Sequence, residues 1–177
     1  MTETNEIQNL RQAVEELERR KREDPLKNVY KPNKFQEQIH GSRAPITVVL
    51  GGNRTGKTYS AVAEAILYAL GRAAYSETPD PPNTIWYIVP TGDVFRDAVQ
   101  PIFDELLPWS KVEKVGGQKL KTYKFTNGSR IVVKSSDQRQ KRLVGAAVDF
   151  AVADEPMPKK VYEEVVARLI STGGRLL

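Results

Sequence analysis

The stretch Gly51-Gly52-Asn53-Arg54-Thr55-Gly56-Lys57-Thr58 decides the fold, because it matches the phosphate-binding pattern G-x-x-x-x-G-K-[ST] at every specified position. The run before it, Ile46–Leu50, is continuously apolar and β-rich, which predicts a strand buried on both faces of a parallel sheet. The run after it, Tyr59–Leu70, is alanine-rich with apolar residues at helical spacing, which predicts a helix. A chance glycine turn between a strand and a helix is the alternative, and the complete pattern with both correct flanks argues against it.

A strand, a glycine loop and a helix in this order let backbone N–H groups surround a polyphosphate at the positive end of the helix dipole. Lys57 would reach the β- and γ-phosphates, and the Thr58 hydroxyl would ligate Mg²⁺. The glycines permit the tight turns and the close approach of backbone to phosphate oxygen. The candidate nucleotide contacts are Gly51, Gly52, Asn53, Arg54, Thr55, Gly56, Lys57, Thr58 and Tyr59.

A second chemical motif follows about 100 residues later, where the apolar run Val148–Ala153 ends in the adjacent carboxylates Asp154 and Glu155. Parallel strands of such folds present their carboxyl ends on the side of the phosphate loop. We therefore expect Asp154 to meet the Mg²⁺ and Glu155 to meet the water that attacks the γ-phosphate. Acidic residues also commonly begin a helix, so the pair gains its meaning from the glycine loop.

The composition excludes several classes of site. The chain has 177 residues, no cysteine and one histidine, His40, so disulfides, thiolate sites and multi-histidine metal sites are ruled out. We expect His40 to be a packing or capping residue rather than a catalyst. No apolar stretch approaches the ~20 residues of a membrane span, and the N-terminus lacks a signal-peptide core. These features predict an intracellular protein without a membrane segment.

The positive charge is concentrated in one part of the chain. The net charge is +5, and residues 111–142 hold ten basic and two acidic residues, a local +8 that leaves −3 for the rest. This segment contains the strongest hairpin signal, Thr126-Asn127-Gly128-Ser129 between two β-rich runs within Leu120–Ser135. The hairpin could face DNA, face a subunit, or only keep a sheet edge soluble.

The sequence divides into three parts. Residues 1–24 contain a predicted amphipathic helix (Asn5–Glu23) with one apolar stripe. Three alternatives follow for this helix: its stripe docks on the domain, its stripe pairs with a partner helix, or the helix frays. Residues 25–45 form a linker and a short helical turn. Its Gln36 is our candidate for the N6/N7 edge of adenine, the alternative being a solvent-facing glutamine. Residues 46–177 form the predicted nucleotide-binding core.

Further elements are predicted within this core. Thr84–Val89 reads as a second buried strand, and Asp93–Leu107 as a helix that Pro101 kinks or splits. Lys159–Ile170 reads as a helix with Val161, Val165 and Leu169 inward, and a strand starts at Arg175. In folds of this type that strand lies between the strand of the glycine loop and the strand of the acidic pair. We therefore expect the chain to be a fragment of a longer protein.

With these residues, the chain from about Phe35 onward resembles the N-terminal ATPase domain of large terminase subunits, the motors that package DNA into viral capsids. The resemblance rests on Phe35-Gln36-Glu37-Gln38-Ile39-His40, on the arginine within the glycine loop, on the hairpin before the acidic pair, on Asp154-Glu155-Pro156 and on Ser171-Thr172-Gly173-Gly174-Arg175. It implies an α/β P-loop NTPase fold of the RecA-like class, with a parallel sheet flanked by helices and an inserted β-hairpin. The family's coupling motif and nuclease domain are not in this sequence.

The resemblance also implies the activity and its partners. It predicts hydrolysis of ATP with Mg²⁺ to drive double-stranded DNA into a capsid, in the host cytoplasm on the procapsid. The implied assembly is a ring, usually a pentamer, with the portal protein and a small terminase subunit as partners and a monomer as one state in isolation. A catalytic arginine is also expected. Arg54 is the candidate that would act in cis, and Arg142 or Arg139 would act in trans from a neighbouring subunit. The alternative for Arg142 is that it only adds to the basic surface.

Two other functions are compatible with the same motifs. A DNA or RNA helicase with an Asp-Glu pair would need helicase motifs and a second RecA-like domain that the sequence does not show. A nucleotide-dependent DNA-binding switch would bind ATP with little turnover. Glu155 argues against the switch, because a protein that only binds ATP does not need a carboxylate placed for water.

Overall fold

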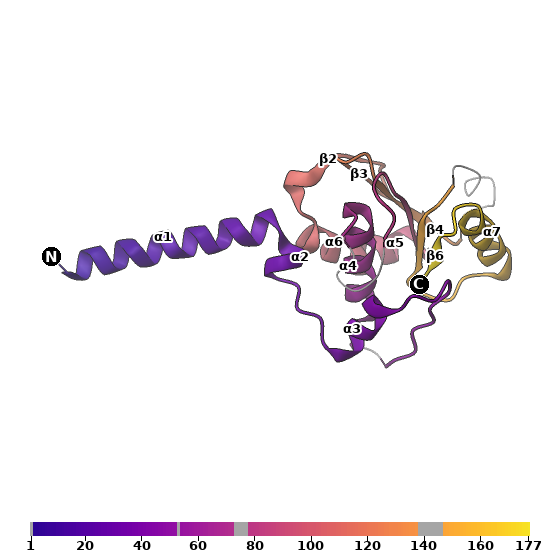
Figure 1. Cartoon of the computed structure of the whole chain (residues 1–177), viewed down its shortest axis with the longest axis horizontal. Helices are drawn as coiled ribbons and strands as arrows, with labels where there is room; N and C mark the ends of the chain where they lie inside the picture. The colour runs from indigo at the N-terminus through magenta and orange to yellow at the C-terminus, as the bar shows by residue number, and fades with distance from the viewer. Residues whose placement is uncertain (1, 53, 73–77, 138–146) are drawn as a thin grey trace.

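The structure is a computed structural model that describes residues 2–52, 54–72, 78–137 and 147–177. Figure 1 shows a compact α/β body from which one long helix projects. The helical elements are α1 (Thr2–Glu23), α2 (Pro25–Asn28), α3 (Lys34–Gly41), α4 (Lys57–Leu70), α5 (Gly92–Val94), the π-helical turn η1 (Phe95–Val99), α6 (Gln100–Leu106), the 3₁₀ turn η2 (Trp109–Lys111) and α7 (Lys159–Ile170).

The described residues form one six-stranded sheet in the order β2-β3-β4-β1-β5-β6. Its strands are β1 (Thr84–Val89), β2 (Val112–Gly116), β3 (Thr122–Phe125), β4 (Arg130–Ser135), β5 (Phe150–Ala153) and β6 (Arg175–Leu176). The strands β4, β1, β5 and β6 run parallel, and β2 and β3 add an antiparallel edge. The fold class predicted from the sequence, a largely parallel sheet flanked by helices with a β-hairpin, is confirmed.

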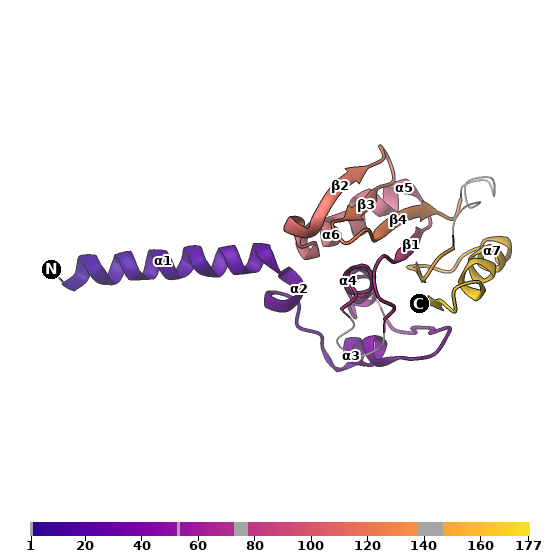
Figure 2. The same ribbon diagram turned by 45° about the horizontal axis from the view of Figure 1, so that its top comes forward.

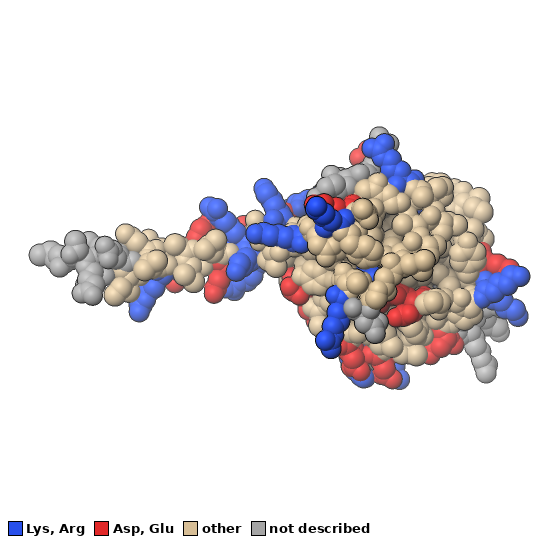
Figure 3. All heavy atoms as spheres, turned by 90° about the horizontal axis from the view of Figure 1, so that it is seen from below, with Lys and Arg blue, Asp and Glu red and all other residues tan. Residues whose placement is uncertain are grey.

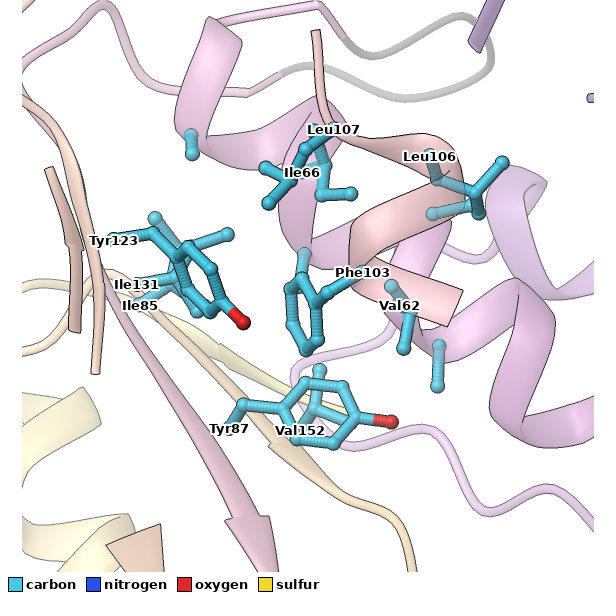
Figure 4. Close-up of a cluster of buried hydrophobic side chains, with 14 of the residues drawn as sticks. Val62, Ile66, Ile85, Tyr87, Phe103, Leu106, Leu107, Tyr123, Ile131 and Val152 are labelled. Carbon is cyan, nitrogen blue, oxygen red and sulfur yellow. The ribbon is translucent and has the colours of Figure 1, made fainter. Parts of the chain in front are cut away.

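Alternate residues of the strands face two different layers. On the inner face, Ile85, Tyr87, Tyr123 and other side chains pack against α4 and α6. Figure 4 shows Phe103 of α6 between Tyr87 and Tyr123, and their ring centroids lie 5.3 and 5.0 Å from that of Phe103. On the outer face, a smaller cluster that includes Trp86, Ile88 and Ala151 packs against α7. Because β1 is covered on both faces, its residues are continuously apolar.

The predicted hairpin is confirmed. It joins β3 to β4, and Gly128 occupies the left-handed region with φ of 84°. The Asn127 side chain donates a hydrogen bond of 2.9 Å to the carbonyl of Ala69, which ties the turn to the end of α4. The predicted helix α7 also has the expected bounds, with Val161, Val165 and Leu169 buried. The helix predicted over Asp93–Leu107 forms as α5, the π-helical turn η1 and α6 in direct succession, so it is not split in two, and Pro101 lies in the first turn of α6.

The prediction that Ile46–Leu50 is a buried strand is wrong. Ile46 makes one isolated parallel bridge to Leu176, and the Thr47 amide donates to the Leu176 carbonyl at 2.9 Å. Val48 and Leu50 are 76% and 84% exposed. Among the described residues this segment pairs only through Ile46 and Thr47, and no described element covers Val48 or Leu50. The strand starting at Arg175 does lie between β5 and this segment, as predicted.

The predicted N-terminal helix forms, but it does not dock its apolar stripe on the domain. Helix α1 projects away from the body in both Figure 1 and Figure 2. The apolar stripe of Ile7, Leu10, Val14 and Leu17 is exposed. Pairs one turn apart, such as Arg20 with Glu16 at 2.7 Å, support the helix locally. Figure 3 shows basic and acidic side chains interspersed along it. Pairing with a partner helix and fraying both stay open.

Candidate nucleotide-binding site

The glycine loop leads into the N-terminus of α4, where Lys57 is the first helical residue. Gly56 has φ of 86°, and a Cβ added there would lie 2.6 Å from Nε2 of the Gln36 side chain, so this position requires glycine. The Lys57 ammonium donates to the carbonyls of Gly51 and Gly52, both at 2.8 Å. The Thr55 hydroxyl donates to the carbonyl of Gly52 at 3.0 Å. The loop is thus closed around its own lysine at the positive end of a 14-residue helix.

Helix α3 places Gln36 directly against this loop. The Gln36 side chain accepts from the Asn33 amide at 3.0 Å, completing a capping box, and donates to the Gly56 carbonyl at 3.2 Å. Gln36 is buried rather than solvent-facing. Its predicted contact with adenine stays a prediction, and the contact that the structure does contain fixes the backbone next to Lys57.

A buried polar chain holds α3 on α4. The Nδ1 of His40 donates to the Glu64 carboxylate at 2.5 Å, and the Tyr30 hydroxyl donates to His40 Nε2 at 2.5 Å. All three residues are buried. His40 therefore packs and bonds within the interior, as expected, and sequence reasoning missed its partner Glu64. The signal that could have found it is that Glu64 is the only charged residue in the run Tyr59–Leu70.

The acidic pair follows β5, which lies between β1 and β6. The Asp154 amide donates to the Ile88 carbonyl at 3.1 Å, which fixes the start of the turn. Burial raises the pKa of the Asp154 carboxyl above its usual value, and the charge of Glu155 raises it further. The Thr58 hydroxyl and the Lys57 ammonium act in the opposite direction. Asp154 is therefore electrostatically coupled to two residues of the glycine-loop motif.

Tyr87 of β1 is a further residue beside Asp154 that the sequence did not single out. Its hydroxyl is buried and lies close enough to Asp154 to lower the pKa of that carboxyl, although the two groups do not have the geometry of a full hydrogen bond. Burial and the nearby Asp154 carboxylate raise the pKa of Tyr87 well above its ordinary value. Its apolar strand neighbours concealed it, because a tyrosine within such a run reads as a core residue.

One open cavity of about 630 Å³ connects the two motifs. Lys57 and Ser60 of α4 line one side of it, and Asp154 and Glu155 line another. The rest of the wall is mostly apolar and includes Val48, Leu50, Met157, Tyr162 and Leu176. Two chemical motifs that are about 100 residues apart in the sequence thus share one space.

The oxygen donors at this place suit magnesium. Mg²⁺ in nucleotide sites is held by one or two protein oxygens together with phosphate oxygens and water, rather than by a cage of side chains. The carboxylate of Asp154 beside the hydroxyl of Thr58 supplies such a pair. Over the described ranges there is no group of three or more His, Cys, Asp or Glu residues that would hold a metal by themselves.

Asn53, Arg139 and Arg142 lie outside the described residues. Arg54 has φ of 65°, a left-handed conformation that is uncommon for a residue with a side chain, and it is exposed. The Tyr59 hydroxyl donates to the Glu105 carboxylate of α6 at 2.7 Å. Burial raises the pKa of Tyr59, and the contact with Glu105 raises it further. Its predicted nucleotide contact stays a prediction.

Comparison with solved structures identifies similar folds. The large terminase ATPase domain of Thermus phage P74-26 is 26% identical, with a TM-score of 0.60, and a mutant of it is 27% identical, with a TM-score of 0.63. Each match covers 84% of this chain and 64% of the other. The large terminase of bacteriophage D6E is 18% identical, with a TM-score of 0.62, and the match covers 82% of this chain and 38% of that one.

Other comparisons complete the assignment. A second D6E structure, solved in complex with ADP, has a TM-score of 0.54. No curated protein sequence matches significantly. In the described part of the chain, no helix is both long and apolar enough to cross a membrane. A family model described as "Terminase large subunit, T4likevirus-type, N-terminal" matches residues 48–177. The chain, with its P-loop NTPase fold, therefore belongs to this terminase large subunit family.

Proposed function

We propose that the chain is the ATP-hydrolysing part of a viral DNA-packaging motor. The observation that carries this proposal is the cavity bounded by Lys57, Asp154 and Glu155. It brings a phosphate-binding loop and two carboxylates together, as ATP hydrolysis requires. Membership of the large terminase family supports the biological role. The chain spans 64% or less of the similar solved chains, so the activity and partners of the whole protein are part of the proposal.

The residues divide the chemistry between them. When ATP binds, Lys57 exchanges the carbonyls of Gly51 and Gly52 for phosphate oxygens and neutralises charge on the transferred group. Thr58 and Asp154 would hold Mg²⁺, which would supply further positive charge to the phosphates when bound. Glu155 accepts a hydrogen bond from the attacking water and orients it in line with the leaving group. Arg54 stabilises developing charge in cis, and Arg142 of a neighbouring subunit completes the site in trans.

The proposed setting is the packaging complex. Double-stranded DNA is the translocated polymer, and the portal protein and the small terminase subunit are the proposed protein partners, in the host cytoplasm on the procapsid. A ring of subunits, usually five, would place Arg142 of one subunit at the site of the next. The isolated chain is expected to be a monomer with slow turnover, because a monomer lacks this trans contribution.

The test is phosphate release with and without double-stranded DNA for the unaltered chain, Lys57→Ala and Glu155→Gln. We expect Lys57→Ala to lose ATP binding. Glu155→Gln should bind ATP but release phosphate about 10²–10⁴-fold more slowly, which is the usual contribution of a positioned acid or base. Exposed Glu163→Gln on α7 serves as the matched control. Equal rates for Glu155→Gln and the unaltered chain would refute the hydrolytic role and favour a binding switch.

A further inference from the structure

The outer face of the sheet has two dissimilar halves. Over β5 and β6 it is apolar and covered by α7. Over β2, β3 and β4 the same face carries Lys114, Lys124 and Arg130, because these residues alternate with inward side chains such as Tyr123, Phe125 and Ile131. Figure 2 shows α7 at the opposite end of the sheet from β2 and β3. This half is solvent-exposed at Lys114 and Lys124 and partly exposed at Arg130.

The three cations lie in one row across three strands. In the sheet register Lys114 is opposite Lys124, Lys124 is opposite Arg130, and Arg130 is opposite Thr84. We call Lys114, Lys124 and Arg130 the cationic row. Neighbouring strands are about 4.8 Å apart, so each charge has a like charge directly beside it. Like charges directly opposite each other destabilise a sheet, which means that the fold itself does not favour this arrangement.

The cationic row has no acidic partner within the described residues. Lys114 and Lys124 form no ion pair there, and Arg130 donates to the Thr84 hydroxyl at 3.3 Å. Next to the row, the ammonium of Lys134 lies 4.3 Å from the ring centre of Trp86. Burial lowers the pKa of Lys134, and the charge of Arg130 lowers it further. Four cations therefore lie on this part of the sheet, and none of Lys114, Lys124 and Arg130 forms an ion pair with a described carboxylate.

We propose that the cationic row is a contact surface for the phosphate backbone of double-stranded DNA. The inference rests on the proposed function, which makes DNA the polymer on which the chain acts. A polyanion compensates closely spaced cations that the protein leaves unpaired. The row is made of cations alone, which suits contact with phosphates, and the duplex is the polymer of the proposed function. Phosphate contacts do not read sequence, as a packaging motor requires.

The first test measures the affinity of a short fluorescein-labelled duplex by anisotropy over a series of KCl concentrations. The variant is Lys114→Gln/Lys124→Gln/Arg130→Gln, and the matched control, Lys21→Gln/Lys31→Gln/Lys160→Gln, removes the same charge from exposed positions elsewhere. Three lost phosphate contacts should make the slope of log Kobs against log[salt] shallower by about 2–3 and weaken binding at least about tenfold. The control should change both quantities far less.

The outcomes separate this inference from the proposed function. Binding of a fluorescent ATP analogue is measured on the same samples and should be unchanged in both triple variants. If the unaltered chain binds ATP and DNA, and the row variant keeps its DNA affinity and salt slope, the inference is wrong while the proposed function stands. A row variant that changes only self-association would assign the surface to a subunit contact and also overturn the inference. Failure of the unaltered chain to bind ATP would count against the proposed function itself.

A second variant excludes simple damage to the fold. Lys124→Glu places a carboxylate between two cations of the row, so it should raise the thermal unfolding midpoint by replacing repulsion with attraction. It should also weaken duplex binding more than Lys31→Glu, which makes the same charge change at another exposed position. A more stable protein with weaker DNA binding is the expected result. A lower midpoint, or unchanged DNA binding, would contradict the proposal.

Discussion

Two segments of similar apolar composition have different structures. The strand β1 (Thr84–Val89) lies between β4 and β5, and Ile85, Trp86, Tyr87, Ile88 and Val89 are buried. The segment Ile46–Leu50 is also apolar, but it makes one bridge at Ile46 and exposes Val48 and Leu50. Apolar content is thus not sufficient for a buried strand. Pairing partners along the whole length and a covering layer on each face are needed as well.

Because of this difference, the two halves of the nucleotide site are held in place by different elements. The acidic pair follows β5 in the closed part of the sheet, where the backbone of Asp154 is bonded to β1. The glycine loop follows the exposed segment, so its position depends on α4 and on the contact of Gln36 with Gly56. The carboxylates are therefore held by the sheet, and Lys57 is held mainly by helices.

The largest expected effect on the free energy of unfolding is at β5, in the part of the sheet that is covered on both faces. Phe150 of β5 is buried and stacked on Tyr68, with ring centroids 4.4 Å apart. Phe150→Ala should lower the free energy of unfolding by about 3–5 kcal/mol, because the substitution leaves a cavity between the sheet and α4. Urea denaturation followed by circular dichroism measures this change. A loss below about 1 kcal/mol would mean that the closed part is not packed as described.

A smaller effect of opposite sign is expected at Tyr87. Its buried hydroxyl lies beside the Asp154 carboxylate without the geometry of a full hydrogen bond, which costs free energy in the folded state. Tyr87→Phe removes that oxygen and keeps the ring, so the free energy of unfolding should rise by about 1 kcal/mol. The same denaturation experiment applies. A decrease would show that the hydroxyl bonds Asp154 in solution and belongs to the acidic side of the site.

The smallest effect on the free energy of unfolding is expected in the exposed segment Ile46–Leu50. Leu50→Ala removes a side chain that is 84% exposed, so stability should change by no more than about 0.5 kcal/mol. This variant is the counterpart of Phe150→Ala, and the ratio of the two losses measures the contrast between the segments. If Leu50→Ala costs as much as a core substitution, Ile46–Leu50 is a packed strand in solution and the contrast disappears.

Local chemistry explains which features could be predicted from the sequence. The loop from Gly51 to Thr58, the Asn127-Gly128 turn and the helix Lys159–Ile170 follow from short-range rules, namely glycine conformation, turn chemistry and helical spacing. The meeting of Lys57 with Asp154 followed from the rule that parallel strands present their carboxyl ends on one side.

The features that could not be predicted depend on distant parts of the chain. A segment such as Ile46–Leu50 is a buried strand only if other segments pair with it and cover it, and the described residues supply one bridge, from Ile46 to Leu176. Whether the apolar stripe of α1 docks depends on where the rest of the fold places a surface that can receive it, which no property of its own sequence reveals, and in the structure the stripe is exposed. Strand β2 (Val112–Gly116) was not predicted, because it is an edge strand with exposed charged residues that forms against β3. The bond between His40 and Glu64 joins α3 to α4 across 24 positions of sequence.

The central claim is that one magnesium-bound nucleotide is held between the glycine loop and the acidic pair. Its most direct test is the affinity of a fluorescent ATP analogue with and without Mg²⁺ for the unaltered chain, for Asp154→Asn and for the exposed control Asp104→Asn. We predict that Mg²⁺ strengthens binding to the unaltered chain and to the control, and has little effect on Asp154→Asn. Full magnesium enhancement in Asp154→Asn would contradict the claim, because the metal would then be held without the acidic pair.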